Sequence, residues 1–321
     1  MAVLAAVSAL LGWIGRQGPR AIAATVIIAI LLPPLDALLR PFVTAAIVAL
    51  LCAAFVRVDL TALRTHISRP GLVLAATAWV SLATPALLGL CCWAAHLAAR
   101  SPDLFLGLMF QAVTTPMMAA PAFAALMGLD PTLVLAVVVA GAAITPFTAP
   151  IFVHIFIGAA MTLSPLALGT KLLAIMAASL AAALIIRRLA GAEKIRRASD
   201  QIDGINILLA FVFVGSVMQD VAPRFLADPL GMIGLTALAF AVNFSLLGLS
   251  ALVFLVAGRE RSFIIGLTAS QRNLGLMLAA TGGAVPDLTW LYVAVSQFPL
   301  YLAPLMLMPL ARRLKTGGKQ V

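Results

Sequence analysis

The sequence contains one arginine in the middle of a long apolar stretch. Arg272 lies near the centre of the segment 262–283, which contains no Asp or Glu. A charged side chain at the centre of a bilayer costs roughly 3 kcal/mol on insertion scales, so the guanidinium of Arg272 needs partners there. Backbone carbonyls, nearby polar side chains or an anionic substrate can fill that role. The polar side chains beside it are those of Thr268, Ser270, Gln271 and Asn273.

A second polar group interrupts the apolar segment 103–128. It consists of Gln111, Thr114, Thr115, Pro116 and Pro121. Proline lacks the amide hydrogen that continues a helix, and lipid cannot satisfy the backbone groups that a break sets free. Helix breaks in membranes therefore occur where they face a protein-lined aqueous cavity, and the free groups there can hold ions or a substrate.

These two groups predict one substrate site. We expect Arg272 to bind the carboxylate or sulfonate of an anionic substrate, with Pro116 and Pro121 as the helix-break residues. The residues predicted to shape the pocket are Thr114, Thr115, Thr268, Ser270, Gln271 and Asn273. A structural alternative stays open, in which Arg272 only donates to unpaired carbonyls and the prolines only kink their helices. The two roles of the arginine are compatible.

Composition dictates the elements that must position these residues. The chain has 321 residues, of which 63% are hydrophobic and 10% are charged. Soluble domains are about half apolar and a quarter charged, so a soluble surface cannot be built from this sequence. The chain is therefore predicted to be an all-α polytopic membrane protein with the lipid bilayer as its main partner. A soluble enzyme and a nucleic-acid-binding domain are excluded.

Charged residues, prolines and glycines divide the chain into ten apolar segments, each near the length of one bilayer crossing. They cover residues 21–39, 41–56, 71–98, 103–128, 131–157, 165–187, 204–220, 229–257, 262–283 and 288–311. Pro33–Pro34 interrupts the first segment. Residues 2–14 are predicted to form an interfacial helix. In the eighth segment, Asn243 and Ser245 are either interhelical hydrogen-bonding groups or part of a cavity lining.

The basic residues give these segments an orientation. With the N-terminus inside, sixteen Lys and Arg residues fall on the inner side and only Arg40, Arg100 and Arg224 on the outer side. Cytoplasmic loops carry the excess of basic residues in membrane proteins. We therefore expect a multi-pass protein of the cell's inner (plasma) membrane, with both termini in the cytoplasm. The net charge of +10 is then mainly a mark of topology.

Five spans in each half would place two homologous halves in inverted orientation, a common transporter architecture. The predicted organisation is an N-terminal interfacial segment (1–20), a first five-helix repeat (21–157), a second inverted repeat (158–311) and a cytoplasmic tail (312–321). Two closely spaced prolines follow each polar break. They are Pro146 and Pro150 in one half, and Pro299 and Pro304 in the other.

The stretches Thr115–Pro150 (TPMMAAPAFAALMGLDPTLVLAVVVAGAAITPFTAP) and Leu267–Gly283 (LTASQRNLGLMLAATGG) resemble the bile acid:sodium symporter family, in its bacterial branch. The resemblance extends over most of the chain. It implies a panel domain and a core domain, in which broken fourth and ninth helices cross at the substrate site.

The chain departs from this family at the sodium ligands. Ala120 and Pro121 stand where the resemblance implies a Ser-Asn pair, and Val134 and Val138 stand where it implies Ser and Thr. Thr268 replaces an acidic ligand and Arg272 replaces a glutamine. The third span has Ser81 and Thr84 ahead of Pro85, but no glutamine. Since hard cations prefer several oxygen ligands, we expect no metal site, and we infer that Arg272 stands where a bound cation would otherwise lie.

The function predicted from these observations is secondary transport of a small organic anion by alternating access, without the sodium coupling of that family. One alternative is a sodium-dependent, bile-acid-like symporter with rearranged ion sites. Another is a membrane receptor that keeps the fold and has lost transport. Paired carboxylates, an HExxH motif, a His/Cys cluster and a Gly-rich phosphate loop are all missing from the sequence, so an enzyme is not expected. No cofactor is expected, and the sequence leaves the oligomeric state open.

Overall fold

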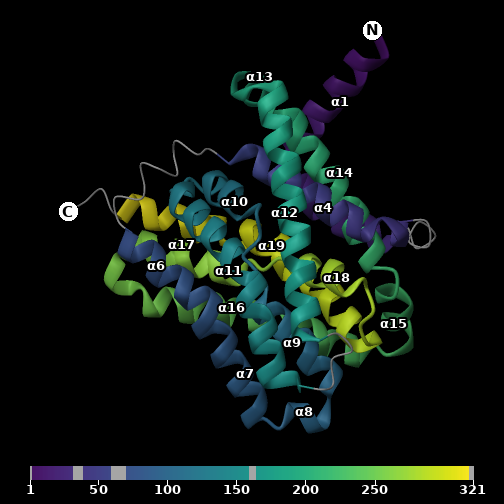
Figure 1. Cartoon of the computed structure of the whole chain (residues 1–321), viewed down its shortest axis with the longest axis vertical. Coiled ribbons are helices and arrows are strands. Elements are labelled where there is room, and N and C mark those ends of the chain that lie inside the picture. Colours follow the sequence, from purple (N-terminus) through teal and green to yellow (C-terminus); the bar gives the residue numbers. More distant parts are fainter. Residues whose placement is uncertain (1, 32–38, 59–69, 159–163, 318–321) are drawn as a thin grey trace. The chain divides into compact units, whose positions relative to one another are not determined.

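The computed structural model describes residues 2–31, 39–58, 70–158 and 164–317, and its regular elements in these ranges are helices (Figure 1). The chain forms two compact units. Unit 1 comprises Met1–Val58 and Ala174–Ile233, and unit 2 comprises Asp59–Leu173 and Gly234–Val321. Pro33–Pro34 lies outside the described residues, and so do Arg64, Arg69 and Lys319, three of the sixteen basic residues that the sequence places on the inner side.

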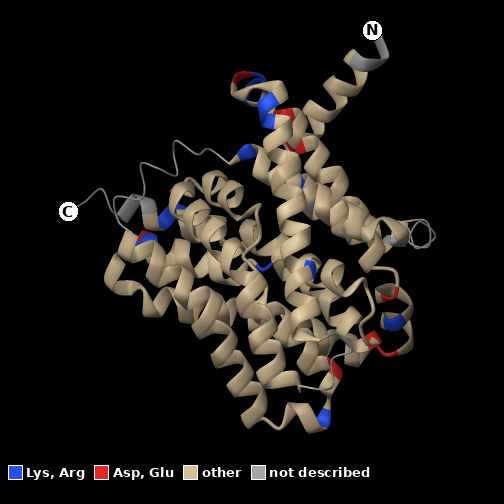
Figure 2. Ribbon diagram, in the orientation of Figure 1, with Lys and Arg blue, Asp and Glu red and all other residues tan. Residues whose placement is uncertain are grey.

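Six helical stretches in the described residues are long and apolar enough to cross a membrane. They are Pro70–Ala94, Pro131–Ile157, Pro165–Ala190, Ser199–Ala227, Pro229–Val253 and Asp287–Leu314. They coincide with six of the ten predicted spans, the third, fifth to eighth and tenth. Helix interiors are almost free of charge, and Lys, Arg, Asp and Glu gather mainly near helix ends (Figure 2). The prediction of an all-helical, multi-pass membrane protein is confirmed.

Unit 1 is built around α14 (Ser199–Val217). Its other helices are α1 (Ala2–Gln17), α2 (Pro19–Leu31), α4 (Val43–Arg57), the second part of α12 (Pro165–Ala190), α13 (Ala192–Arg197) and α15 (Val221–Ala227). Helix α1 packs on α14 at backbone contact. A Cβ atom on Gly15 would lie 1.9 Å from the Asp200 carbonyl oxygen, and one on Gly204 would lie 2.1 Å from that of Leu11. Only glycine allows this approach.

Arginines tie the ends of the unit 1 helices together. Arg187, in the last turn of α12, donates to the carbonyl oxygens of Val56 and Val58 at the end of α4. Arg57 pairs with Asp203, and Arg16 pairs with Asp200 at 3.5 Å. Each bond joins segments more than a hundred residues apart in sequence, so these arginines hold the helices of unit 1 in register at one end.

Unit 2 contains the two segments that were predicted to be interrupted. The first is α9 (Pro102–Val113) followed by α10 (Ala120–Leu126), and the second is α17 (Arg259–Ser270) followed by α18 (Leu274–Thr281). Around them lie α6 (Pro70–Ala78), the π-helical η3 (Trp79–Ala83), α7 (Thr84–Ala94), α8 (Leu97–Arg100), α11 (Pro131–Ile157), α16 (Pro229–Val253), η5 (Leu255–Ala257) and α19 (Asp287–Gly317). Every residue from Ser262 to Ser270 is buried, which places α17 in the core of the unit.

The two interrupted segments are built alike. In each, a helix of 12 residues precedes the interruption, and within two residues of the end of the short helix after it comes a glycine with positive φ, Gly128 or Gly282. Such a glycine is the usual end of a helix, because it adopts the left-handed conformation without strain. The long helix that follows contains the predicted proline pair, Pro146 and Pro150 inside α11 and Pro299 and Pro304 inside α19.

Candidate functional site

The two helix interruptions in unit 2 pair with each other. The amide of Met117 donates to the carbonyl of Gln271 at 2.7 Å, and the amide of Asn273 donates to the carbonyl of Thr115 at 3.0 Å. These bonds form an antiparallel bridge centred on Pro116 and Arg272. The backbone groups freed by one interruption are thus satisfied by the other, as a bilayer requires.

The prolines account for the local backbone of the first interruption. Pro116 has no amide hydrogen, and its ring disfavours the helical conformation at the preceding Thr115. Helix α9 accordingly ends at Val113. Pro121 lies in the first turn of α10, where a helix tolerates proline because the amide hydrogen there has no partner within the helix. The two predicted helix-break residues thus have different places, one inside the interruption and one at the start of the next helix.

The guanidinium of Arg272 lies at the centre of the bridge and is held by backbone carbonyls. Its side chain is 1% exposed. Nε donates to the Ala269 carbonyl at 2.7 Å, Nη1 to that of Thr114 at 3.0 Å, and Nη2 to that of Val80 at 3.0 Å. In the described part of the chain, no carboxylate forms an ion pair with Arg272. The sequence predicted backbone carbonyls, polar side chains or an anionic substrate as partners of this arginine, and in the structure backbone carbonyls bind it.

Two of these carbonyls are free because they stand at helix C-termini. In a continuing helix the carbonyl of Ala269 would accept from the amide of Asn273, but that amide bonds to Thr115 instead. Thr114 directly follows the last residue of α9. Helix C-termini carry partial negative charge, so a cation shared between two of them is stabilised electrostatically.

The third carbonyl is free because of a π-helical turn. The amide of Thr84 reaches back five residues to the carbonyl of Trp79, so it skips the carbonyl of Val80. The next donor in this pattern would be residue 85, which is a proline and has no amide hydrogen. Val80 therefore has no helical donor, and Arg272 supplies one. π-Helical turns of this kind recur at functional sites.

The hydroxyl groups predicted to face the arginine bond elsewhere. Thr268 donates to the carbonyl of Ile264 at 2.8 Å and Ser270 to that of Leu267 at 3.0 Å, both within α17. Thr114 donates across the interruptions to the carbonyl of Asn273 at 2.7 Å. The hydroxyl of Thr115 donates to the carbonyl of the next residue. Seven residues were predicted to bind the substrate, Arg272 and the six that shape the pocket. Asn273 is half-buried and the other six are buried.

Several buried atoms of side-chain amides at this site have no hydrogen-bond partner in the described residues. Both Nε2 and Oε1 of Gln271 are unpartnered, although the residue is 0% exposed. Asn243, on α16, donates through Nδ2 to the carbonyl of Ser270 at 2.9 Å, while its Oδ1 is unpartnered. A buried polar group without a partner is costly. These amides are therefore the groups at this site best suited to bind a ligand or ordered water.

Residues outside the predicted substrate-binding set also belong to the site. Gln111, three residues before the first interruption, accepts from the hydroxyl of Tyr292 on α19, and its Nε2 is unpartnered. Val80 contributes only a backbone oxygen, so its side chain gives no signal in the sequence. Pro85 could have indicated the free carbonyl of Val80 from the sequence, because a proline inside a helix leaves a carbonyl about one turn earlier without its donor. Asn243 is an interhelical hydrogen-bonding group, one of its two predicted roles.

A cavity of about 280 Å³ borders the same π-helical turn within unit 2. Trp79 and Thr84 line one wall and α16 lines the other, where Ser245 takes the second predicted role, that of a cavity-lining residue. Trp79 donates through Nε1 to the hydroxyl of Ser250 at 2.8 Å across the same two elements. Trp79 lines this cavity, and the next residue along the turn, Val80, bonds to Arg272. The turn therefore connects the cavity to the arginine.

The residues around Arg272 do not fit a sodium ion of the kind that the family resemblance implies. Ala120, Val134 and Val138 belong to the hydrophobic core of unit 2 and carry no side-chain oxygen. The carbonyl oxygens that face the gap between the helices are bonded to the guanidinium. Within the described residues, no three His, Cys, Asp or Glu side chains are grouped closely enough to hold a metal ion.

Comparison with known proteins adds no family to this description: the chain matches no protein-family model and no curated protein sequence.

Proposed function

We propose that this protein is a secondary transporter of a small organic anion, with its substrate site at the paired helix interruptions of unit 2. The observation that carries the proposal is the guanidinium of Arg272, which lies buried between the two interruptions. Carbonyl dipoles balance it, and no carboxylate does so in the described residues. Alternating access would expose this site in turn to each side of the membrane.

The pairing of the interruptions supports transport. Interrupted helices at corresponding positions of two halves are the best structural pointer to a transporter's midplane substrate site. Here each interruption follows a helix of 12 residues and is followed by a short helix, a glycine turn and a proline-containing span. The division into two compact units, one holding both interruptions, supports the panel and core arrangement of the family that the sequence resembles.

The unused hydrogen-bonding capacity of the site supports an anionic substrate. A guanidinium has five N–H donors, and three hydrogen bonds hold that of Arg272. The side-chain amide of Gln271, the residue before it, is unpartnered in the described residues. A carboxylate or sulfonate accepts from both kinds of donor and supplies the negative charge that the site lacks. The substrate class proposed is therefore a small organic anion.

The same contacts argue against sodium coupling. A sodium ion at the crossing of two helix C-termini would be held by carbonyl oxygens, and these already bond to a covalently attached cation. We propose ten spans, both termini in the cytoplasm and a place in the inner membrane, because the basic residues are distributed that way along the chain. Substrate movement then proceeds without sodium.

The proposal can be tested with purified full-length protein. A thermal-shift screen of small carboxylates, sulfonates and sterol-derived acids, with sodium or choline as the cation, identifies the anion that stabilises it. That anion is then offered to proteoliposomes, and counterflow is measured for the wild type, Arg272→Lys and Arg272→Gln. The matched control is Arg261→Gln, which alters an exposed arginine at the other end of α17.

The expected result is counterflow that is equal in sodium and choline, is retained in Arg261→Gln and falls at least tenfold in Arg272→Gln. Unchanged counterflow in Arg272→Gln would refute the anion site. A strict requirement for sodium would favour the sodium-dependent alternative. Stabilisation by an anion without any counterflow would favour a receptor.

A further inference from the structure

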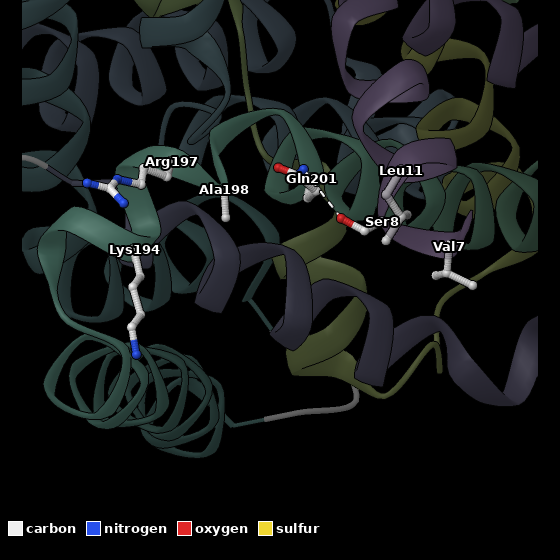
Figure 3. Close-up of a pocket in the computed structure, with 7 residues that line it drawn as sticks. All are labelled: Val7, Ser8, Leu11, Lys194, Arg197, Ala198 and Gln201. Atoms are coloured by element: carbon white, nitrogen blue, oxygen red, sulfur yellow. Dashed lines mark hydrogen bonds between the residues drawn. The ribbon is translucent and has the colours of Figure 1, made fainter. Parts of the chain in front are cut away.

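A second cavity, in unit 1, has a lining suited to a different ligand. It measures about 460 Å³ and lies among α1, α13 and α14 (Figure 3). Its lining residues are Val7, Ser8, Leu11, Lys194, Arg197, Ala198 and Gln201. None of them belongs to the site described above.

The lining changes in character from one end to the other. Figure 3 shows Lys194 and Arg197, both on α13, at one end of the cavity and Val7 and Leu11 of α1 at the other. Between them, Gln201 donates to the hydroxyl of Ser8 at 3.5 Å, which is a long hydrogen bond. The cavity therefore has a cationic end, a polar middle and an apolar end.

The walls of this cavity are fixed by packing. Gly15 and Gly204 bring α1 and α14 into backbone contact, so the apolar wall cannot move away from the polar one without losing that contact. Gly191 has a φ of 79° and starts α13, which lets the chain turn between α12 and the cationic wall. Oε1 of Gln201 is buried and unpartnered. The cavity is thus an open depression whose polar wall contains an acceptor atom without a partner in the described residues.

The charges at the cationic end favour an anion. The carboxylate of Glu193 is shared between Arg197 at 2.8 Å and Arg196 at 2.6 Å. Two arginines on one carboxylate leave an excess of positive charge. Lys194 forms no ion pair within the part of the chain that the structure describes. No acidic side chain lines the cavity.

We propose that this cavity binds an anionic phospholipid, with the phosphate at Lys194 and Arg197 and the base of the acyl chains against Val7 and Leu11. A free phosphate would not use the apolar end. The cavity lies at the start of the candidate span Ser199–Ala227, the level at which lipid headgroups meet a membrane protein. On the orientation proposed above this is the cytoplasmic leaflet, whose anionic lipids attract basic segments.

Binding of lipids to purified protein in a neutral detergent tests this inference, with no need for a transport substrate. The ligands are phosphatidylglycerol, phosphatidylcholine and inorganic phosphate, and bound lipid is counted by native mass spectrometry. The variants are the double substitution K194Q/R197Q and a control, R259Q/R261Q, which removes two basic charges from the start of α17 in unit 2. Melting temperatures without lipid check that both variants fold.

Each basic residue near an anionic lipid headgroup strengthens binding about fivefold, so the K194Q/R197Q protein is expected to bind phosphatidylglycerol about 30-fold more weakly than the wild type. The control should bind it as the wild type does, and phosphatidylcholine should bind weakly to all three proteins. Equal weakening in the control would mean general surface attraction and overturn the site. Displacement of the lipid by equimolar inorganic phosphate would overturn the lipid assignment.

Discussion

The role assigned to Arg272 predicts a large and repairable loss of stability when its side chain is removed. In Arg272→Ala, the carbonyls of Ala269, Thr114 and Val80 lose their donor inside the core of unit 2. The cavity left behind has the shape of a guanidinium and is walled by two helix C-termini. Dissolved guanidinium or methylguanidinium ions are therefore expected to restore part of the stability at millimolar concentration.

The size of the effect follows from two opposing terms. Hydrogen bonds to charged groups contribute about 1.5–3 kcal/mol each, so three amount to about 5–9 kcal/mol. Burying the charge costs several kcal/mol, and the variant recovers this part. The net loss expected for Arg272→Ala is therefore about 3 kcal/mol. For a chain of this size that corresponds to a fall in melting temperature of about 5 °C.

The assay is thermal unfolding in detergent, with guanidinium, methylguanidinium, sodium, potassium or choline chloride at one ionic strength. Arg261→Ala is the matched control, because Arg261 is exposed on the same helix and should change stability by less than about 0.5 kcal/mol. The melting temperature of Arg272→Lys should lie between those of the wild type and Arg272→Ala, since an ammonium cannot present the planar fork of donors that reaches three carbonyls. Choline should rescue nothing.

Rescue by sodium in Arg272→Ala, with no effect of sodium on the wild type, would show directly that the side chain replaces a dissociable cation. The reasoning would be refuted if Arg272→Ala melted at the wild-type temperature. It would also be refuted if the variant were unstable but insensitive to every small cation, because the carbonyls would then have other partners.

Two further substitutions test the local arguments. Pro85→Ala supplies an amide hydrogen that can donate to the carbonyl of Val80 in the same five-residue pattern as the bond from Thr84 to Trp79, so the π-helical turn should lengthen and Val80 should gain a donor that competes with Arg272. We expect counterflow to fall severalfold while the melting temperature changes little. Gly204→Val places side-chain atoms against the backbone of α1, so we expect a loss of about 1–3 kcal/mol and faster proteolysis of α1, measured against Gly248→Val, where the structure leaves open space.

Much of the fold follows from the sequence because a bilayer leaves the backbone few choices. A spanning segment must satisfy its own hydrogen bonds, and so it is a helix whose ends are marked by charges, prolines and glycines. The segment predicted at 131–157 is α11 to the residue, because Asp130 caps its first turn by accepting from the amide of Thr132 and a glycine ends it. The six long spans were predicted for this reason.

The partners of Arg272 were harder to predict because they are backbone atoms. The sequence pointed to hydroxyl and amide groups beside the arginine, yet Thr268 and Ser270 bond to carbonyls of their own helix. Ser and Thr in helices often do so, since a carbonyl three or four residues earlier lies within reach of their hydroxyl. Which carbonyls remain free depends on where each helix ends, and helix ends are set by tertiary contacts such as the bond from Asn273 to Thr115.

A cation that is part of the chain also constrains the energetics of the proposed transport. A bound sodium ion would travel with the substrate and offset its charge, whereas the charge of Arg272 returns with the protein in every cycle. Transport of a monovalent anion alone therefore moves one negative charge across the membrane. An inside-negative potential of 100 mV opposes its uptake by about 2.3 kcal/mol, or about 50-fold in the accumulation ratio.

Such a carrier favours efflux of its anion unless a second ion moves with it. Proteoliposomes with an imposed potassium diffusion potential distinguish the cases. Uptake that falls as the interior becomes more negative indicates uniport of the anion. Uptake that ignores the potential requires exchange for another anion or a proton carried with the substrate, and a pH gradient across the same liposomes separates these two. If an inside-negative potential drives uptake, and does so only when sodium is present, then Arg272 has not displaced the coupling ion.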